Sequence, residues 1–258
     1  MKLQFLGTGA ADWNLEEHKN FPDFRRWSSA IIDGDLLIDP GPHIFDFSES
    51  FRLPNIYDGV KNIIVTHSHG DHFNTETVKK LFDLNPDIKI YGDLAIGIKL
   101  KDDPKCQNID FVEIKLLEET QVGDYCIVAL PGNHTDVTIE TVRHYSIEKN
   151  GKKLFYGTDG GWLTCIEWNY MRNRKYDTMI FELTIGDVPG DYRIFTHTST
   201  AMLKIMLETV RNQNGVARDG KIYVTHMARK LHPDHNTLHE SLKPMAVTPA
   251  YDGMIIEI

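Results

Sequence analysis

Three histidines and one aspartate fall within six residues of the stretch NIIVTHSHGDHFN, which spans residues 62–74. They follow directly on an apolar and β-branched run that predicts a buried strand. Imidazoles and carboxylates bind divalent transition metals at about 2.0–2.2 Å. Just past a strand end, His67 and His69 can point the same way towards one ion, while Asp71 and His72 turn towards another. The alternative is a polar loop with chance histidines.

Such a motif supplies only half of a two-ion site, so further ligands are expected at other strand ends. His134 follows the apolar run CIVALPGN, Asp159 lies in LFYGTDGG, and His226 closes KIYVTH. A lone histidine is more often structural than a ligand. Three polar residues at three strand ends instead indicate a shared binuclear centre.

The elements that must position these residues can be predicted from periodicity and turn signals. Strands are expected in 2–11, 61–66, 87–93, 176–186, 221–227 and 249–258, hairpins or strand pairs in 30–38, 110–135 and 143–161, and helices from Thr75 (as N-cap) to Phe82, over 94–100 and over 199–215. Strands in meanders with interspersed helices favour an α/β (α+β) four-layer αββα sandwich over a regular βαβ sheet. No linker or short repeat interrupts residues 1–258, so a single domain is expected.

The composition limits the classes of partner. The chain has 258 residues, 28 basic and 37 acidic, with a formal charge of −9. This charge makes a nucleic-acid polymer an unfavourable partner, because phosphate binding depends on Lys and Arg. A small anionic substrate in a metal-loaded pocket remains compatible with it, and a homodimer is a further option.

The sequence also bears on the compartment. No apolar run approaches the roughly 18 residues of a membrane span, and no signal peptide precedes the first strand. The three cysteines, Cys106, Cys126 and Cys165, form no CxxC pair. They are expected to be free thiols in a reducing compartment, so a cytoplasmic protein is predicted.

Together, the HxHxDH motif, the isolated histidine, the aspartate turn and the final histidine resemble the metallo-β-lactamase superfamily. The resemblance runs from FLGTGAA to YDGMIIEI, almost the whole chain. It implies two bound divalent ions. Zinc is the first expectation, and such a site also accepts manganese or iron. The implied ligands are His67, His69 and His134 for the first ion and Asp71, His72 and His226 for the second, with Asp159 bridging both.

A further aspartate matches the superfamily's first motif. Asp39, in LLIDPGPH, corresponds to an aspartate that supports the ligand loop from behind. An ordinary turn aspartate before Pro-Gly is the alternative.

Within the superfamily, the chain is most similar to the PhnP-type phosphodiesterase and tRNase Z branch. Both begin with strands like this chain's LQFLGTG, and His197 matches the histidine that they use as a general acid or transition-state donor. The alternative for His197 is a histidine in a helix N-terminal cap. The ending, with AYDGM, resembles PhnP, which implies that His235 and Asp252 contact substrate or support a ligand.

This chain also departs from both relatives. PhnP's additional structural zinc is not expected, because its cysteine cluster is missing and Arg229 replaces its histidine. The long tRNA-gripping arm of tRNase Z is missing too. An insertion over residues 12–27 could form a lid in which Arg25 or Arg26 pairs with a phosphate. An ordinary surface loop packed by its own aromatic residues explains it equally well.

The resemblance implies a phosphodiesterase that acts through a metal-bridging hydroxide. Asp71 and Asp159 would orient that hydroxide, and His197 would protonate the leaving alkoxide. A cyclic ribose phosphate or a nucleotide-like diester is the expected substrate. Three alternatives stay open: a carboxyl-ester, lactone or thioester hydrolase on the same site, a tRNA 3′-processing-like endoribonuclease, and a non-enzymatic metal-binding module.

Overall fold

The computed structural model of the protein describes residues 1–134 and 140–258. Within these ranges the strands form two mixed seven-stranded sheets. The first sheet runs, edge to edge, β14 (Ile255–Glu257), β1 (Lys2–Gly7), β2 (Ser29–Ile32), β3 (Leu36–Ile38), β4 (Asn62–Ile64), β5 (Lys89–Gly92) and β6 (Asp110–Glu113). The second runs β13 (Thr248–Pro249), β12 (Val216–Thr225), β11 (Tyr176–Glu182), β10 (Lys152–Gly157), β9 (Arg143–Lys149), β8 (Tyr125–Pro131) and β7 (Glu119–Val122).

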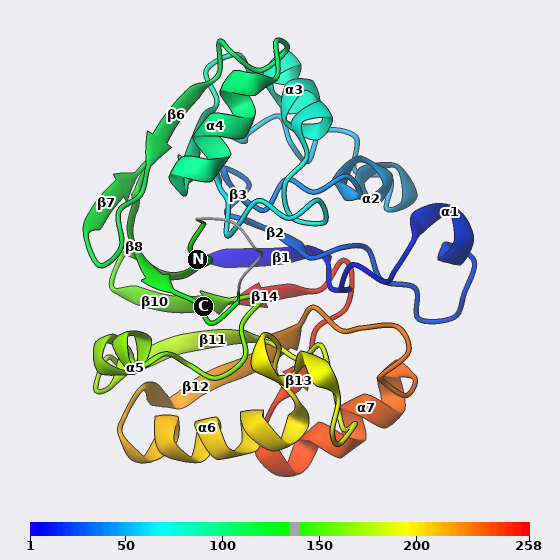
Figure 1. Ribbon diagram of the computed structural model, residues 1–258, viewed down its shortest axis with the longest axis vertical. Helices are drawn as coiled ribbons and strands as arrows, with labels where there is room; N and C mark the ends of the chain where they lie inside the picture. Colours follow the sequence, from blue (N-terminus) through cyan, green and yellow to red (C-terminus); the bar gives the residue numbers. More distant parts are fainter. Residues whose placement is uncertain (135–139) are drawn as a thin grey trace.

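Helices cover the outer face of each sheet (Figure 1). On the first sheet lie α2 (Ile44–Ser50), α3 (Thr75–Leu84) and α4 (Leu94–Asp102), and on the second α5 (Cys165–Met171), α6 (Thr200–Asn212) and α7 (His235–Leu242). The short helix α1 (Leu15–His18) stands apart in the insertion after β1, and the 3₁₀ helices η1 (Tyr192–Phe195) and η2 (Lys243–Met245) complete the described elements. The order helix, sheet, sheet, helix confirms the expected αββα sandwich.

Three apolar layers hold this sandwich together. The middle layer, between the sheets, includes fully buried Phe5, Ile38, Tyr145 and Ile180. The outer layers lie between each sheet and its helices. Because both faces of each sheet are covered, central strands such as SAII in β2 are buried at every position.

Most of the predicted elements form, with shifted ends. The hairpin around Asn150 and Gly151 is present, and both residues have the positive φ, 52° and 73°, that a two-residue hairpin turn favours. The N-cap of α3 is Asn74 rather than the expected Thr75, because the Asn74 side chain accepts a hydrogen bond from the Thr77 amide. Helix α6 ends at Asn212, before the expected Gly215.

Helices α2, α5 and α7 were not predicted. Each is only seven or eight residues long, too short for a clear helical period. One local signal was present for α5, since Thr164 and Glu167 form a capping box at its start. Among the described helices, none has the length and apolar character needed to cross a membrane.

Candidate metal centre

The seven predicted ligands come together at one edge of the sandwich, where several strands end. Their ligand atoms form two groups, each with all atoms within 4.8 Å of one another. The groups are His67, His69, His134 and Asp159, and Asp71, His72, Asp159 and His226. Asp159 belongs to both, which is the arrangement expected from the sequence.

The spacing of these atoms suits metal coordination. Nε2 of His67 and Nε2 of His72 each lie 3.3 Å from Oδ2 of Asp159. Tetrahedral ligands at about 2.0–2.1 Å from a zinc ion are about 3.4 Å apart. The buried Nε2 of His67 also has no hydrogen-bond partner among the described residues. A buried polar atom without a partner is costly, and a divalent ion would satisfy it.

Hydrogen bonds orient three of the histidine rings from behind. In each ring, Nδ1 meets an oxygen on the side away from the cluster. The pairs are His72 with Oδ2 of Asp39 at 2.8 Å, His134 with the Thr196 carbonyl at 3.0 Å, and His226 with Oγ1 of Thr184 at 2.8 Å. When Nδ1 carries the donated proton, Nε2 keeps its lone pair for a metal ion.

Asp39, which contacts His72, is itself held in place by hydrogen bonds. It is fully buried, and its carboxylate accepts hydrogen bonds from the amide of Thr66 at 2.7 Å and from its hydroxyl at 2.8 Å. The turn after Asp39 also packs against the ligand loop: a Cβ on Gly41 would lie 2.2 Å from the Asp71 carbonyl oxygen. Glycine at position 41 therefore allows the two loops to approach each other.

Three residues of the site adopt the left-handed backbone conformation. Asp39, Asp159 and His226 all follow strand ends and have φ values of 56°, 58° and 54°. Left-handed conformations are unfavourable for residues other than glycine, and they persist where the surroundings impose them. Here the conformation turns each side chain towards the cluster directly after its strand.

The electrostatics of the clusters favour cations. Burial would raise the pKa of Asp159, but His226 and His72 hold it well below its usual range. Burial would lower the pKa of His226, yet Asp159 and Asp71 raise it to about 10. Burial, together with the neighbouring His72, lowers the pKa of His67 to about 3. The carboxylates are therefore ionised, and His67 is neutral with a lone pair to offer.

His197 lies beside the clusters and is held by Glu182, which was not predicted. Nδ1 of His197 is 2.8 Å from Oε1 of Glu182. The fully buried Glu182 also accepts hydrogen bonds from the amides of Gly160 and Thr184, so its position is fixed. Burial lowers the pKa of His197, but Glu182 raises it above its ordinary value. The available signal was an acidic residue directly after the apolar run MIF, inside the strand predicted over 176–186.

A second unpredicted pair lies behind the bridging aspartate. His144 and Glu167 are buried, and their Nδ1 and Oε1 atoms are 2.5 Å apart. Nε2 of His144 lies 3.2 Å from the Asp159 carbonyl oxygen. Burial lowers the pKa of His144, but Glu167 raises it above its usual value. This pair supports the turn that carries Asp159.

The clusters open into a cavity of about 230 Å³. Its lining consists of Ala10, Ala11, Asp12, His69, Asp71, His134, Asp159, Thr184, Arg193, His197, His226 and Ala228. Asp12 and Arg193 were not predicted as site residues. Both lie in segments without a regular sequence pattern, so only the fold brings them to the two clusters.

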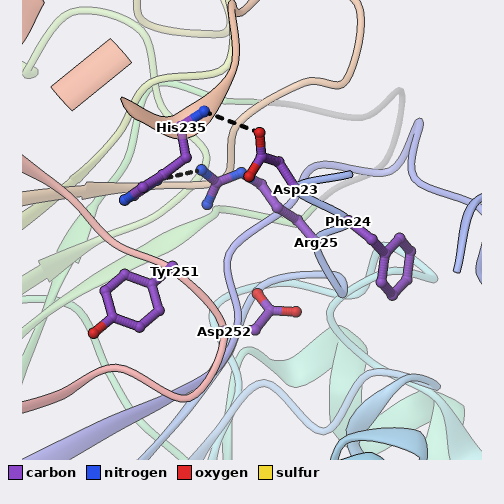
Figure 2. Close-up of a pocket in the computed structure, with 6 residues that line it drawn as sticks. All are labelled: Asp23, Phe24, Arg25, His235, Tyr251 and Asp252. Carbon is purple, nitrogen blue, oxygen red and sulfur yellow. Dashed lines mark hydrogen bonds between the residues drawn. The ribbon is translucent and has the colours of Figure 1, made fainter. Parts of the chain in front are cut away.

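Four other predicted site residues lie around a neighbouring cavity. Arg25, His235 and Asp252 line a space of about 320 Å³ together with Asp23, Phe24 and Tyr251 (Figure 2). The side chain of Arg26 is directed to Asp46 and Asp252. None of these four side chains lines the metal cavity, so a contact with substrate stays a prediction for each of them.

The guanidinium of Arg25 is held in place by three hydrogen bonds. Its Nη1 donates to Oγ1 of Thr8 at 2.8 Å and to the Ala250 carbonyl at 2.7 Å, and its Nη2 donates to Nδ1 of His235 at 3.0 Å. The latter bond is drawn in Figure 2. Burial lowers the pKa of Arg25, an effect that Asp252 and Asp23 oppose.

The insertion over residues 12–27 packs partly on its own aromatic residues and partly on other segments of the chain. Trp13 is buried against Phe24, edge to face, and its indole donates to the Met227 carbonyl at 2.9 Å. Only Asp12 of this segment lines the metal cavity. Its aromatic packing agrees with the surface-loop alternative, and its role as a lid stays a prediction.

Comparisons with known proteins agree with this fold. A family model described as a β-lactamase superfamily domain matches residues 35–227. No curated protein sequence matches the chain.

Several solved structures are similar over their full length. Zn²⁺-bound PqqB from Methylobacterium extorquens has a TM-score of 0.76 at 16% identity, with 100% of both chains covered. A diphosphatase of the PhnP family has a TM-score of 0.75 at 18% identity, and the match covers 100% of this chain and 96% of the diphosphatase. The short form of human tRNase Z has a TM-score of 0.67 at 20% identity, and the match covers 100% of this chain and 99% of tRNase Z. At these identities the similarity shows the fold.

Proposed function

This chain belongs to the metallo-β-lactamase superfamily of metal-dependent hydrolases, and we propose that it hydrolyses a small phosphodiester. The observation that carries this proposal is the His197–Glu182 pair beside the two His/Asp clusters. An alkoxide leaving group needs a proton, and this pair holds a proton donor at the mouth of the centre.

We propose that His67, His69 and His134 hold one divalent ion, Asp71, His72 and His226 hold a second, and Asp159 contacts both. Zinc is the first choice, and manganese or iron would also be accepted by this ligand set. When bound, such ions lower the pKa of water towards neutrality and polarise a phosphoryl oxygen.

The side chains of this chain have distinct tasks in the proposed reaction. His197 donates its Nε2 proton to the departing oxygen, because Nδ1 is engaged by Glu182. Asp71 and Asp159 stay ionised and orient the attacking water by accepting its hydrogen bonds. Glu182 keeps the imidazole of His197 protonated and aligned until the proton is transferred.

Two further observations support phosphodiester chemistry. The structural relatives include a diphosphatase of the PhnP family and a tRNase, so two proteins of this fold have names that refer to hydrolysis at phosphorus. The cavity is small, about 230 Å³, and the chain's formal charge of −9 opposes a polyanion. A cyclic ribose phosphate or a nucleotide-like diester is therefore the proposed substrate class.

A substrate panel tests the proposal on the metal-loaded protein. We expect kcat/KM for bis(p-nitrophenyl) phosphate to exceed that for p-nitrophenyl acetate and for a set of lactones and thioesters. His67→Ala, which removes a ligand, should abolish the phosphodiesterase activity. Faster hydrolysis of the carboxyl esters or lactones would replace the proposal by the ester-hydrolase alternative.

Two further outcomes would also overturn it. Cleavage of pre-tRNA in preference to small diesters would identify an endoribonuclease. Tight metal binding with no turnover on any substrate of the panel would indicate a non-enzymatic metal-binding module.

A further inference from the structure

The turn at η1 brings one permanent positive charge to the metal cavity. Arg193 is the single lysine or arginine among the described residues that line this cavity. It lies four residues before His197, the proposed proton donor. Arginine is suited to oxygen anions because its planar guanidinium presents several N–H groups in a fixed geometry.

Asp191 fixes the guanidinium of Arg193 from one edge. Nε donates to Oδ1 at 2.8 Å and Nη2 to Oδ2 at 2.6 Å, and the amide of Arg193 donates to Oδ1 at 2.9 Å. The hydrogen bonds that Arg193 donates to Asp191 raise the pKa of Arg193, so the charge is retained. Nη1 has no protein acceptor among the described residues, which leaves this edge able to donate to a ligand.

Two aromatic side chains accompany Arg193 on the same turn. Tyr192 is 82% exposed and Phe195 is 79% exposed. In a 3₁₀ helix, residues three apart lie above one another on one face, so the two rings share an edge of η1. The guanidinium carbon of Arg193 is 5.4 Å from the centroid of the Tyr192 ring. Both rings are on the turn that carries Arg193, which lines the cavity, and large exposed aromatic residues gathered on one turn are typical of a binding surface.

The turn is also firmly attached to the metal centre. The Thr196 carbonyl lies 3.0 Å from Nδ1 of the ligand His134, and Oγ1 of Thr198 donates to the carbonyls of Gly160 and Gly161 beside Asp159. These hydrogen bonds hold the backbone directly after η1 against the turn that carries Asp159 and against His134.

A carboxylate outside the two clusters adds a negative charge to the lining. Asp12 lines the same cavity, and both of its carboxylate oxygens accept the Arg229 amide, at 2.9 and 3.0 Å. An anionic group entering the cavity is repelled there and attracted at Arg193. Among the charged side chains that line the cavity, Arg193 on η1 is therefore the one that attracts the anionic part of a diester.

We propose that Arg193, Tyr192 and Phe195 form a subsite for the ring-bearing half of the substrate, which is a nucleoside or aryl phosphodiester. Nη1 of Arg193 donates to an oxygen of the bound phosphate, and the two rings stack on the base or aryl group. This inference rests on the proposed phosphodiesterase function and adds a selection against alkyl diesters. Stacking of a base on an aromatic side chain contributes about 1–3 kcal/mol, or roughly five- to 150-fold in affinity.

Two substrates with the same leaving group test the ring contact. Thymidine 5′-p-nitrophenyl phosphate and methyl p-nitrophenyl phosphate both release p-nitrophenolate and differ in the other ester group. We expect kcat/KM to favour the thymidine ester by about tenfold or more. In the double variant Tyr192→Ala/Phe195→Ala this ratio should fall towards one. Ile205→Ala, which removes an exposed apolar side chain of α6, should keep the wild-type ratio.

A KM measurement tests Arg193. Arg193→Gln should raise KM for thymidine 5′-p-nitrophenyl phosphate by about tenfold or more, with a smaller change in kcat, because a charge-assisted hydrogen bond is lost. Arg193→Lys should recover part of that loss. Arg218→Gln, on the exposed part of β12, is the matched control and should not raise KM. An equal ester preference in wild type, or a ratio unchanged in the double variant, would overturn the inference.

A binding experiment separates this inference from the proposed function. Calorimetric titration of the metal-loaded protein with thymidine 5′-monophosphate needs no turnover. Weaker binding in the double variant and in Arg193→Gln, but not in the controls, would support the subsite even if no diester were hydrolysed. No binding to wild type, or equal binding in all variants, would overturn it. A third result would also overturn the inference: the double variant sediments differently from wild type while the ratio of kcat/KM for the two esters is unchanged. The two rings would then be covered by a second copy of the chain.

Discussion

The metal cavity and the neighbouring cavity around Arg25 and His235 contain the same kinds of side chain but use them differently. A third cavity shares Arg25 and His235 with the neighbouring cavity and Ala228 with the metal cavity. Around Arg25, hydrogen bonds to Thr8, Ala250 and His235 satisfy the polar groups within the protein. In the metal cavity, carboxylates and imidazoles from several strand ends converge instead on common points.

This difference teaches how a ligand site is recognised. Histidine, arginine and aspartate in a cavity do not by themselves indicate chemistry, because such groups often stabilise one another. An ion site is indicated when several nitrogen and oxygen atoms lie as close together as the ligands of one ion. It is indicated further when the imidazole rings are held on their other side, as here by Asp39, Thr184 and a backbone carbonyl. The variants below compare the two cavities, from the largest expected effect on turnover to the smallest.

Replacing the aspartate shared by both clusters should have the largest effect. Asp159→Asn should lower kcat/KM on the order of 10³-fold and reduce the bound metal, because a neutral amide is a poor bridging ligand. Metal content by plasma mass spectrometry and turnover are measured on the same sample. Asp252→Asn, the matched change beside the other cavity, should keep the wild-type metal content. Equal metal loss in both variants would erase the distinction between the cavities.

His197→Ala should lower kcat by about 10²–10³-fold on a diester with an alkoxide leaving group, while metal content stays at the wild-type level. The loss should be smaller with p-nitrophenolate as leaving group, since that anion needs little protonation. His235→Ala, at the neighbouring cavity, is the control and should change kcat by no more than about twofold. The assignment of His197 as proton donor fails if the loss is the same for both leaving groups.

Asp39→Asn should act through the metal rather than through the chemical step. Loss of the carboxylate behind His72 is expected to weaken metal affinity about 10–100-fold. Turnover should return towards wild type when excess metal is added. Affinity is measured by competition with a chelator, and a kcat deficit that saturating metal does not restore would argue against a supporting role.

Arg25→Gln should change stability and leave turnover nearly unaltered. The charged group makes three hydrogen bonds in a buried position, so the free energy of unfolding should fall by about 1.5–3 kcal/mol. Urea denaturation measures this change, with Arg25→Lys retaining part of the stability. A large fall in kcat/KM without a change in stability would instead place Arg25 in contact with the substrate.

Much of the architecture could be predicted because its signals are local. Buried strands bounded by turns such as Asn150-Gly151 are visible in the chain, and polar residues directly after them mark the ligands. The short helices α5 and α7 were missed, since one or two turns carry too weak a period against the cost of helix nucleation.

The supporting and substrate-facing residues were harder to predict. Glu182, Thr184 and Arg193 gain their roles from contacts between segments far apart in sequence, which no local pattern encodes. Arg25 and His235 lie around another cavity than the clusters, so their contact with substrate stays a prediction, which Arg25→Gln and His235→Ala test.

The central claim is that the seven clustered residues bind two ions and that these ions are required for phosphodiester hydrolysis. The most direct test strips the protein with a chelator, removes the chelator, and titrates Zn²⁺ or Mn²⁺ while hydrolysis of thymidine 5′-p-nitrophenyl phosphate is followed. The account predicts no activity in the stripped protein, a rise with added metal, and a plateau at two equivalents per chain. Full activity before any metal is added, or activity that does not respond to metal, would contradict it.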